Sequence, residues 1–164
     1  MHAKFAVACG LIFGCVVLGY GFQNPLHASC KVDWTFGISC KEVNTRIVNQ
    51  MKKWKGPENC EGGGEKCLYE VIFSNATYIK GTHTTPVKKY VDTFTFTFVN
   101  ANLTCKAEGF SSSDVWYAVL DYGTNYCNIH NLIEGAELHK VKGYTKTTSD
   151  SICTQYSSAN CTVY

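Results

Sequence analysis

Eight cysteines that follow residue 28 constrain the fold of this chain more than any other feature. An even set of this size indicates a disulfide-stabilised domain from an oxidising compartment, so we expect four disulfides and no free thiol. Short separation favours pairing Cys60 with Cys67 and Cys153 with Cys161, although spacing alone leaves the connectivity open. The eight are Cys30, Cys40, Cys60, Cys67, Cys105, Cys127, Cys153 and Cys161.

The first 28 residues have the pattern of a secretory signal peptide. Lys4 is followed by an apolar run from Phe5 to Leu18, and small residues offer cleavage sites at Gly19-Tyr20-Gly21 and Leu26-His27-Ala28. We expect cleavage after Ala28, which leaves residues 29–164 as one extracellular domain. This cleavage would also remove the two remaining cysteines, Cys9 and Cys15, which lie in the leader.

An uncleaved membrane anchor is the alternative for the same segment. The stretch from Phe5 to Phe22 approaches the length that spans a bilayer. Gly10 and Gly14 interrupt it and no basic cluster flanks it, so we favour the signal peptide and expect no membrane association.

The charge of the secreted part is nearly balanced. Lys4 is the only charged residue of the leader, so 14 basic and 13 acidic residues remain, and Arg46 is the one arginine. A balanced chain with a single guanidinium has little means of attracting phosphates, which argues against a nucleic-acid partner. Three sequons fit a secreted glycoprotein, with acceptors at Asn75, Asn102 and Asn160.

One amphipathic helix is predicted from about Cys40 to Lys55. Ser39 and Glu42 have the spacing of a capping box, and Gly56-Pro57 is a stop signal. An apolar stripe on this helix should pack against a sheet, and it consists of Val43, Ile47, Met51 and Trp54.

After this helix, apolar residues recur at every second position instead of every third or fourth. Phe94, Phe96 and Phe98 alternate with threonines, which predicts a strand with an inward aromatic face. No second helical pattern alternates with the strands, so the predicted fold is α+β and mainly antiparallel β: one N-terminal helix on a curved, disulfide-stabilised sheet. Cys153 and Cys161 should hold the polar tail, and Asp121 should be a turn residue after a strand. Further strands are predicted at 68–73, 77–80, 103–107 and 115–120.

Residues that could carry catalysis or hold a metal are scarce. His83, His130 and His139 lack the spacing of a zinc site, and a Cys–His nucleophile would need an unpaired thiol. The Gly62–Gly64 run is enclosed by two cysteines and does not precede a helix, unlike a phosphate-binding loop. We therefore expect no catalytic residues, no metal and no cofactor, and a protein that is not an enzyme.

The segment Gly62-Gly-Gly-Glu-Lys-Cys67 stands ahead of a predicted strand, and a second segment runs from Trp116 through Asp121-Tyr122 to Cys127. These two segments resemble the secreted salivary lipocalins of ticks. The resemblance implies a lipocalin-like protein that binds a small apolar or amine ligand. A helix followed by a strand meander is also similar to cystatins, although the inhibitory Gln-x-Val-x-Gly segment is absent.

The inward aromatic residues either fill a core or line a ligand pocket. If they line a pocket, its residues would be Phe94, Phe96, Phe98 and Trp116. The first function considered is a secreted protein that sequesters a small hydrophobic or amine ligand. The alternative is a secreted protein-interaction module, such as an inhibitor or host-directed effector, whose extracellular protein partner contacts the loop from Thr82 to Lys89.

Overall fold

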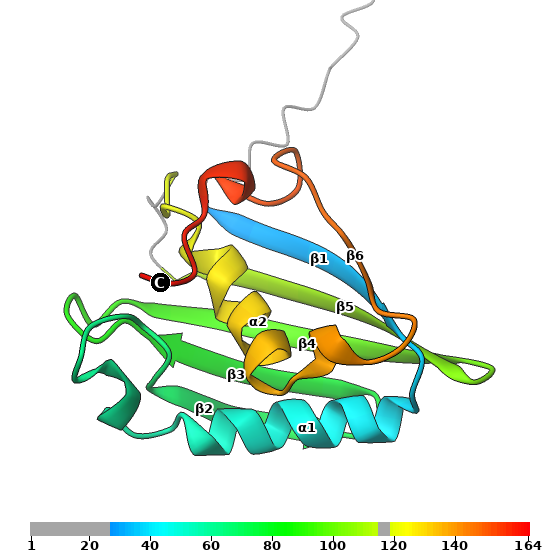
Figure 1. Ribbon diagram of the computed structural model, residues 1–164. Coiled ribbons are helices and arrows are strands. Elements are labelled where there is room, and N and C mark those ends of the chain that lie inside the picture. Colours follow the sequence, from blue (N-terminus) through cyan, green and yellow to red (C-terminus); the bar gives the residue numbers. More distant parts are fainter. Residues whose placement is uncertain (1–26, 115–118) are drawn as a thin grey trace, which may run out of the picture.

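The computed structural model describes residues 27–114 and 119–164, which form an α+β fold with four disulfides (Figure 1). The leader up to residue 26 and Trp116 lie outside these residues. Within them, six antiparallel strands form one sheet in the order β2-β3-β4-β5-β1-β6, with β2 and β6 at its two ends. The elements are β1 Ser29–Phe36, α1 Cys40–Lys53, β2 Tyr69–Asn75, β3 Tyr78–Thr84, β4 Val91–Ala101, β5 Thr104–Ser113, α2 Thr124–Gly135 and β6 Thr145–Thr147.

The first strand lies in the interior of the sheet. Cys30, Val32, Trp34 and Phe36 are buried and alternate with more exposed neighbours, as in a strand with one face on a core. Strand β1 pairs with β5 along its whole length and with β6 on its other side. The helix α1 is therefore not the first element of the domain, and the prediction of an N-terminal helix is not supported.

Helix α1 occupies the residues that the sequence indicates, ending at Lys53. The Ser39 hydroxyl accepts a hydrogen bond from the Glu42 amide at 3.2 Å, which caps the first turn. Val43, Ile47 and Met51 form the buried stripe of the helix. Trp54 follows the last turn and packs its ring 5.8 Å from that of Tyr69.

Both helices cover the same face of the sheet, and the core lies between them and the strands (Figure 1). Phe94, Phe96 and Phe98 point into this core, with consecutive ring centroids 6.0 and 6.3 Å apart. The Trp34 ring lies 5.9 Å from that of Phe96, so β1 and β4 contribute to one aromatic cluster. The opposite face of the sheet carries mostly threonine and charged side chains, together with the partly exposed Phe73 and Phe110.

A second helix, α2, corrects the prediction that only one is present. Ahead of it, Gly123 adopts a left-handed φ of 81°, and the Asp121 carboxylate accepts the Gly123 amide at 3.1 Å. Asp121 is a turn residue, but the turn leads into a helix. Of the strand predicted at 115–120, only Val119 and Leu120 are described, and neither belongs to a strand.

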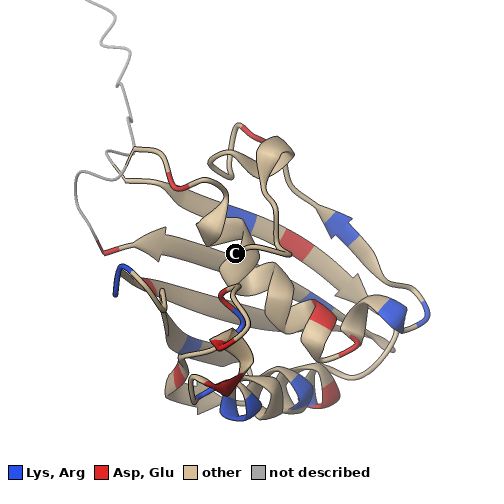
Figure 2. Cartoon of the chain, turned by 60° about the vertical axis from the view of Figure 1, so that its left-hand side comes forward, with Lys and Arg blue, Asp and Glu red and all other residues tan. Residues whose placement is uncertain are grey.

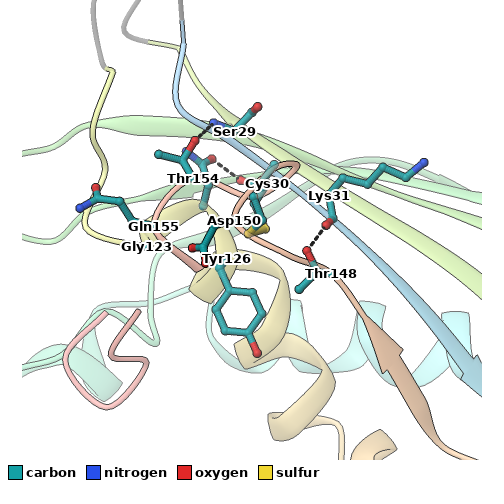
Figure 3. Close-up of a disulfide and its surroundings, with 12 residues drawn as sticks. Ser29, Cys30, Lys31, Gly123, Tyr126, Thr148, Asp150, Thr154 and Gln155 are labelled. Atoms are coloured by element: carbon teal, nitrogen blue, oxygen red, sulfur yellow. Dashed lines mark hydrogen bonds between the residues drawn. A yellow bond between two sulfur atoms is a disulfide. The ribbon is translucent and has the colours of Figure 1, made fainter. Parts of the chain in front are cut away.

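All eight predicted cysteines are paired, as Cys30–Cys153, Cys40–Cys105, Cys60–Cys67 and Cys127–Cys161. The pairing of Cys60 with Cys67 matches the expectation from spacing, whereas that of Cys153 with Cys161 does not occur. The tail is fastened along β1, as Figure 3 shows, because the Thr148 hydroxyl donates to the Lys31 carbonyl at 2.6 Å. No helix in the described part of the chain is long and apolar enough to cross a membrane.

Candidate ligand-binding cleft

The aromatic residues proposed to line a pocket fill the core instead. Phe94 and Phe96 are fully buried and Phe98 is 3% exposed. None of the three lines the cleft described below. Trp116, the fourth predicted ligand residue, lies outside those residues. A core packed on all sides leaves no volume for a ligand at the phenylalanines.

A cleft of about 500 Å³ opens at one end of the sheet, where β3 passes into β4 and β5 ends. The turn ahead of α2 forms another wall. Three of its side chains are carboxylic acids and three are tyrosines, while Lys88 is its single basic residue. The lining residues are Glu65, Thr85, Lys88, Tyr90, Asp92, Ser113, Leu120, Asp121, Tyr122, Thr124 and Tyr164.

The three carboxyl groups reach the cleft from separate parts of the chain. Glu65 lies in the glycine-rich loop that the Cys60–Cys67 disulfide closes. Asp92 is the second residue of β4, and Asp121 belongs to the turn before α2. The fold therefore collects negative charge at one place, although charges of both signs are interspersed along the chain (Figure 2).

A buried hydrogen-bond network fixes two of these carboxylates from behind. Asn128 donates to Asp92 Oδ2 at 2.8 Å and to the Ser111 hydroxyl at 3.3 Å. Ser111 in turn donates to Asn125 Oδ1 at 2.7 Å, and Asn125 donates to Asp121 Oδ2 at 2.8 Å. Since the asparagines and Ser111 are almost fully buried, the network holds both acids in fixed positions.

His83 lies on the strand beside Asp92, directly opposite it in the β3–β4 register. Its Nε2 is 2.7 Å from the Glu65 carbonyl oxygen, so this nitrogen carries the proton and donates. The imidazole ring stacks on that of Tyr69 at 4.5 Å. Burial lowers the pKa of His83, which keeps the ring neutral at physiological pH.

Glu65 and Asp92 are harder to ionise than ordinary carboxyl groups. Burial, reinforced by the charge of Asp92, raises the pKa of Glu65 from 4.5 to about 7. Burial also raises the pKa of Asp92, although hydrogen bonds from Asn128 and Ser113 oppose this effect. A positive group in the cleft would stabilise both ionised forms.

Some buried acceptor atoms at and behind the cleft lack a hydrogen-bond donor within the described part of the chain. Glu65 Oε2, His83 Nδ1 and Asn131 Oδ1 have no hydrogen-bond partner among the residues that the structure describes. An unpaired buried acceptor costs free energy, so a ligand that brings N–H donors would relieve this cost. An ammonium group, with three donors and a positive charge, has this chemistry.

Tyrosines supply the aromatic part of the cleft lining. Tyr90 and Tyr122 are largely exposed at the cleft, and Tyr164 lines it from the tail. Aromatic rings attract cations through their negative faces and also pack against apolar groups. Within residues 27–114 and 119–164, no cluster of three or more His, Cys, Asp or Glu side chains is suited to a metal ion.

One sequence signal could have indicated this site. Asp92 precedes Phe94 by two residues, so its side chain lies on the same inner face of the strand as the phenylalanines. A charged residue on such a buried face is unusual. Glu65 carries no such signal, because its loop reaches the cleft through tertiary structure. No protein-family model matches this chain, and no curated protein matches it.

Proposed function

We propose that this protein is a secreted binding protein that takes up a small amine, with a protonated nitrogen and an apolar body, in the cleft at the end of the sheet. The observation that carries the proposal is the combination of three carboxyl groups with three tyrosines in one cleft. The volume of about 500 Å³ is in the range that holds small-molecule ligands. The four disulfides fit a protein that works outside the cell.

The charges favour an amine over the other ligand classes. A fatty acid would bring its carboxylate close to Glu65, Asp92 and Asp121, with only Lys88 to offset the repulsion. A purely apolar ligand would remove water from these acids without replacing its hydrogen bonds. A protonated amine pairs with the acids while its apolar part contacts the tyrosines.

Calorimetric titration with a set of matched ligands tests the proposal. A phenylalkyl amine should bind with saturation, whereas its neutral N-acetyl analogue and a fatty acid of similar size should bind far more weakly. Glu65→Gln should lower the affinity for the amine about tenfold, through loss of a charged hydrogen bond. Glu61→Gln is the matched control, because Glu61 lies in the same disulfide-closed loop but does not line the cleft. Equal affinity for the amine and the N-acetyl analogue would contradict the proposal.

A protein partner at the same end of the molecule is the second candidate. Val87 in the β3–β4 loop is 83% exposed, and Leu120 at the cleft is also largely exposed. Exposed apolar side chains around a cleft are typical of surfaces that contact another protein. If no amine binds, Val87→Asp should weaken capture of an extracellular partner while leaving the stability of the domain unchanged.

A further inference from the structure

The outer face of the sheet carries an unusual aromatic side chain next to a sequon. Strand β2 contains a bulge, because its register passes from Val71 opposite Gly81 to Phe73 opposite Lys80. Ile72 is the extra residue. In a regular strand, Phe73 would point to the same inner face as Val71, two positions earlier. Because of the extra residue, Phe73 instead points to the outer face, together with the exposed Lys80.

Phe73 and Asn75 are neighbours on this outer face. They are two positions apart along the strand, with Ser74 between them, so their side chains lie on the same face. Phe73 is 51% exposed, and its ring centroid lies 6.3 Å from that of Tyr78, the residue paired with Asn75 across the hairpin. The Asn75 side chain therefore has an exposed aromatic surface as its neighbour.

The turn also presents Asn75 in a form suited to glycosylation. Asn75 Oδ1 accepts hydrogen bonds from the Thr77 amide at 3.0 Å and the Thr77 hydroxyl at 3.3 Å. Neither bond uses Nδ2, the atom to which an N-linked sugar is attached. Asn44 of α1 donates to the Asn75 carbonyl at 3.0 Å, which ties this turn to the rest of the domain.

We propose that Asn75 carries an N-linked glycan whose first N-acetylglucosamine packs on the ring of Phe73 and stabilises the β2–β3 hairpin. One face of a pyranose ring presents C–H groups that neighbouring oxygens make slightly positive. These groups are attracted to the negative face of an aromatic ring, and the contact also removes apolar ring surface from water. The exposed position of Phe73 is then explained by the sugar that covers it.

The other two sequons provide internal controls. The residue two positions before Asn102 is Asn100, and the one two positions before Asn160 is Ser158. Neither can offer an aromatic ring to the attached sugar. A glycan at Asn102 or Asn160 should therefore contribute less to stability than a glycan at Asn75.

The test uses the full chain from a eukaryotic secretory host. Mass spectrometry of glycopeptides should first show that Asn75 is occupied. Thermal melts then compare three forms: the intact glycoprotein, the protein trimmed to one N-acetylglucosamine per site, and the fully deglycosylated protein. We expect the trimmed form to melt with the intact protein and the sugar-free form to melt about 3 °C lower.

Variants distinguish the aromatic contact from a general effect of glycans. In Phe73→Leu, which keeps an apolar side chain without a π face, removal of the last sugar should no longer change the melting temperature. The deglycosylating enzyme also converts each glycosylated asparagine to aspartate. This change occurs in both wild type and Phe73→Leu, so its effect on the melting temperature cancels when the two proteins are compared. Asn102→Asp removes the acceptor at Asn102 but keeps a residue type that tolerates its left-handed φ of 57°, and it should leave the melting temperature of the glycoprotein unchanged. An unoccupied Asn75, or an equal loss on sugar removal in wild type and Phe73→Leu, would overturn the proposal.

Discussion

The amino group of Lys146 lies 2.6 Å from the phenolic oxygen of Tyr126 and joins the edge strand β6 to helix α2. The same nitrogen is 5.1 Å from the ring centroid of Tyr126 and 5.4 Å from that of Tyr156. The two rings meet edge to face at 4.9 Å. One cation therefore holds three segments together: α2, β6 and the tail.

Replacement of this cation should weaken the attachment of β6. Lys146→Met should lower the free energy of unfolding by about 1 kcal/mol, because it removes a hydrogen bond and two cation–π contacts but keeps the apolar stem. Tyr126→Phe should cost less, since the ring remains. Urea melts of both variants and the double variant measure the coupling; fully additive losses would show that the two side chains do not interact.

The inward phenylalanines should behave as core residues. Phe96→Ala should lower the free energy of unfolding by about 3 to 5 kcal/mol, whereas Phe110→Ala on the opposite face should cost less than about 1.5 kcal/mol. Amine binding by the folded Phe96→Ala protein should match wild type, because Phe96 does not line the cleft. Denaturant melts and titration of the same samples check both statements, and similar losses from the two variants would be inconsistent with a filled core.

Glu65 should make stability depend on pH. The unfolded chain releases the Glu65 proton near pH 4.5, while the folded chain keeps it until about pH 7. The folded state is therefore favoured at low pH, and this contribution is lost as the pH rises from 4.5 through 7. Because the side chain is partly exposed, we expect a loss of about 1 kcal/mol. Glu65→Gln should lack this loss in urea melts at pH 4.5 and 8, and parallel curves for both proteins would argue against it.

Amine binding should depend on the same proton. A bound ammonium favours ionised Glu65, so binding at pH 6 must release a proton that is already absent at pH 8. For an amine that stays protonated throughout, affinity should rise up to about tenfold between these pH values. Titrations in buffers of different ionisation enthalpy would detect proton release near pH 7. Binding that is independent of pH in wild type would exclude Glu65 as the ammonium partner.

The mature protein should retain Ala28. Its carbonyl accepts hydrogen bonds from the Ser113 amide at 3.3 Å and the Asn125 side chain at 3.1 Å, and Ala28 is buried. The sequence favours cleavage after Ala28. Cleavage there would remove Ala28 with the leader peptide, and the domain would lose both hydrogen bonds to its carbonyl. Cleavage after Gly21 would preserve both bonds. N-terminal sequencing of the secreted protein decides between the two, and a chain that begins at Ser29 would contradict this expectation.

Elements with strong local signals were predictable. Helix α1 has a cap, an apolar stripe and a stop signal, and β4 has an alternation of phenylalanine and threonine. Strand β1 was missed although Val32, Trp34 and Phe36 alternate in the same way. That strand could have been found from the sequence.

Helix α2 was missed for a physical reason. Its buried residues include Asn125, Asn128 and Asn131 beside Tyr126 and Ile129, so polar side chains interrupt the apolar stripe that would have indicated a helix. Asparagine and β-branched residues also have low helix propensity. Asn125 bonds locally to Asp121, but the partners of Asn128 and Asn131 are distant in sequence, and no local pattern contains them. For the same reason the cleft could not be assembled from the sequence.

The interior position of β1 has a consequence for the order of folding. Its partners on one side are in β5, with Ser29 opposite Ser112, and on the other side in β6, with Asp33 opposite Thr147. During synthesis, α1 and the β2–β5 meander can pair locally, but β1 must wait for residues more than a hundred positions downstream before both of its edges are covered. Formation of the Cys30–Cys153 bond must wait for the same residues. Among the described strands, β1 is the first to be synthesised and the last to have both edges covered. After β5 has paired with it, the other edge of this apolar strand stays open until β6 has been made.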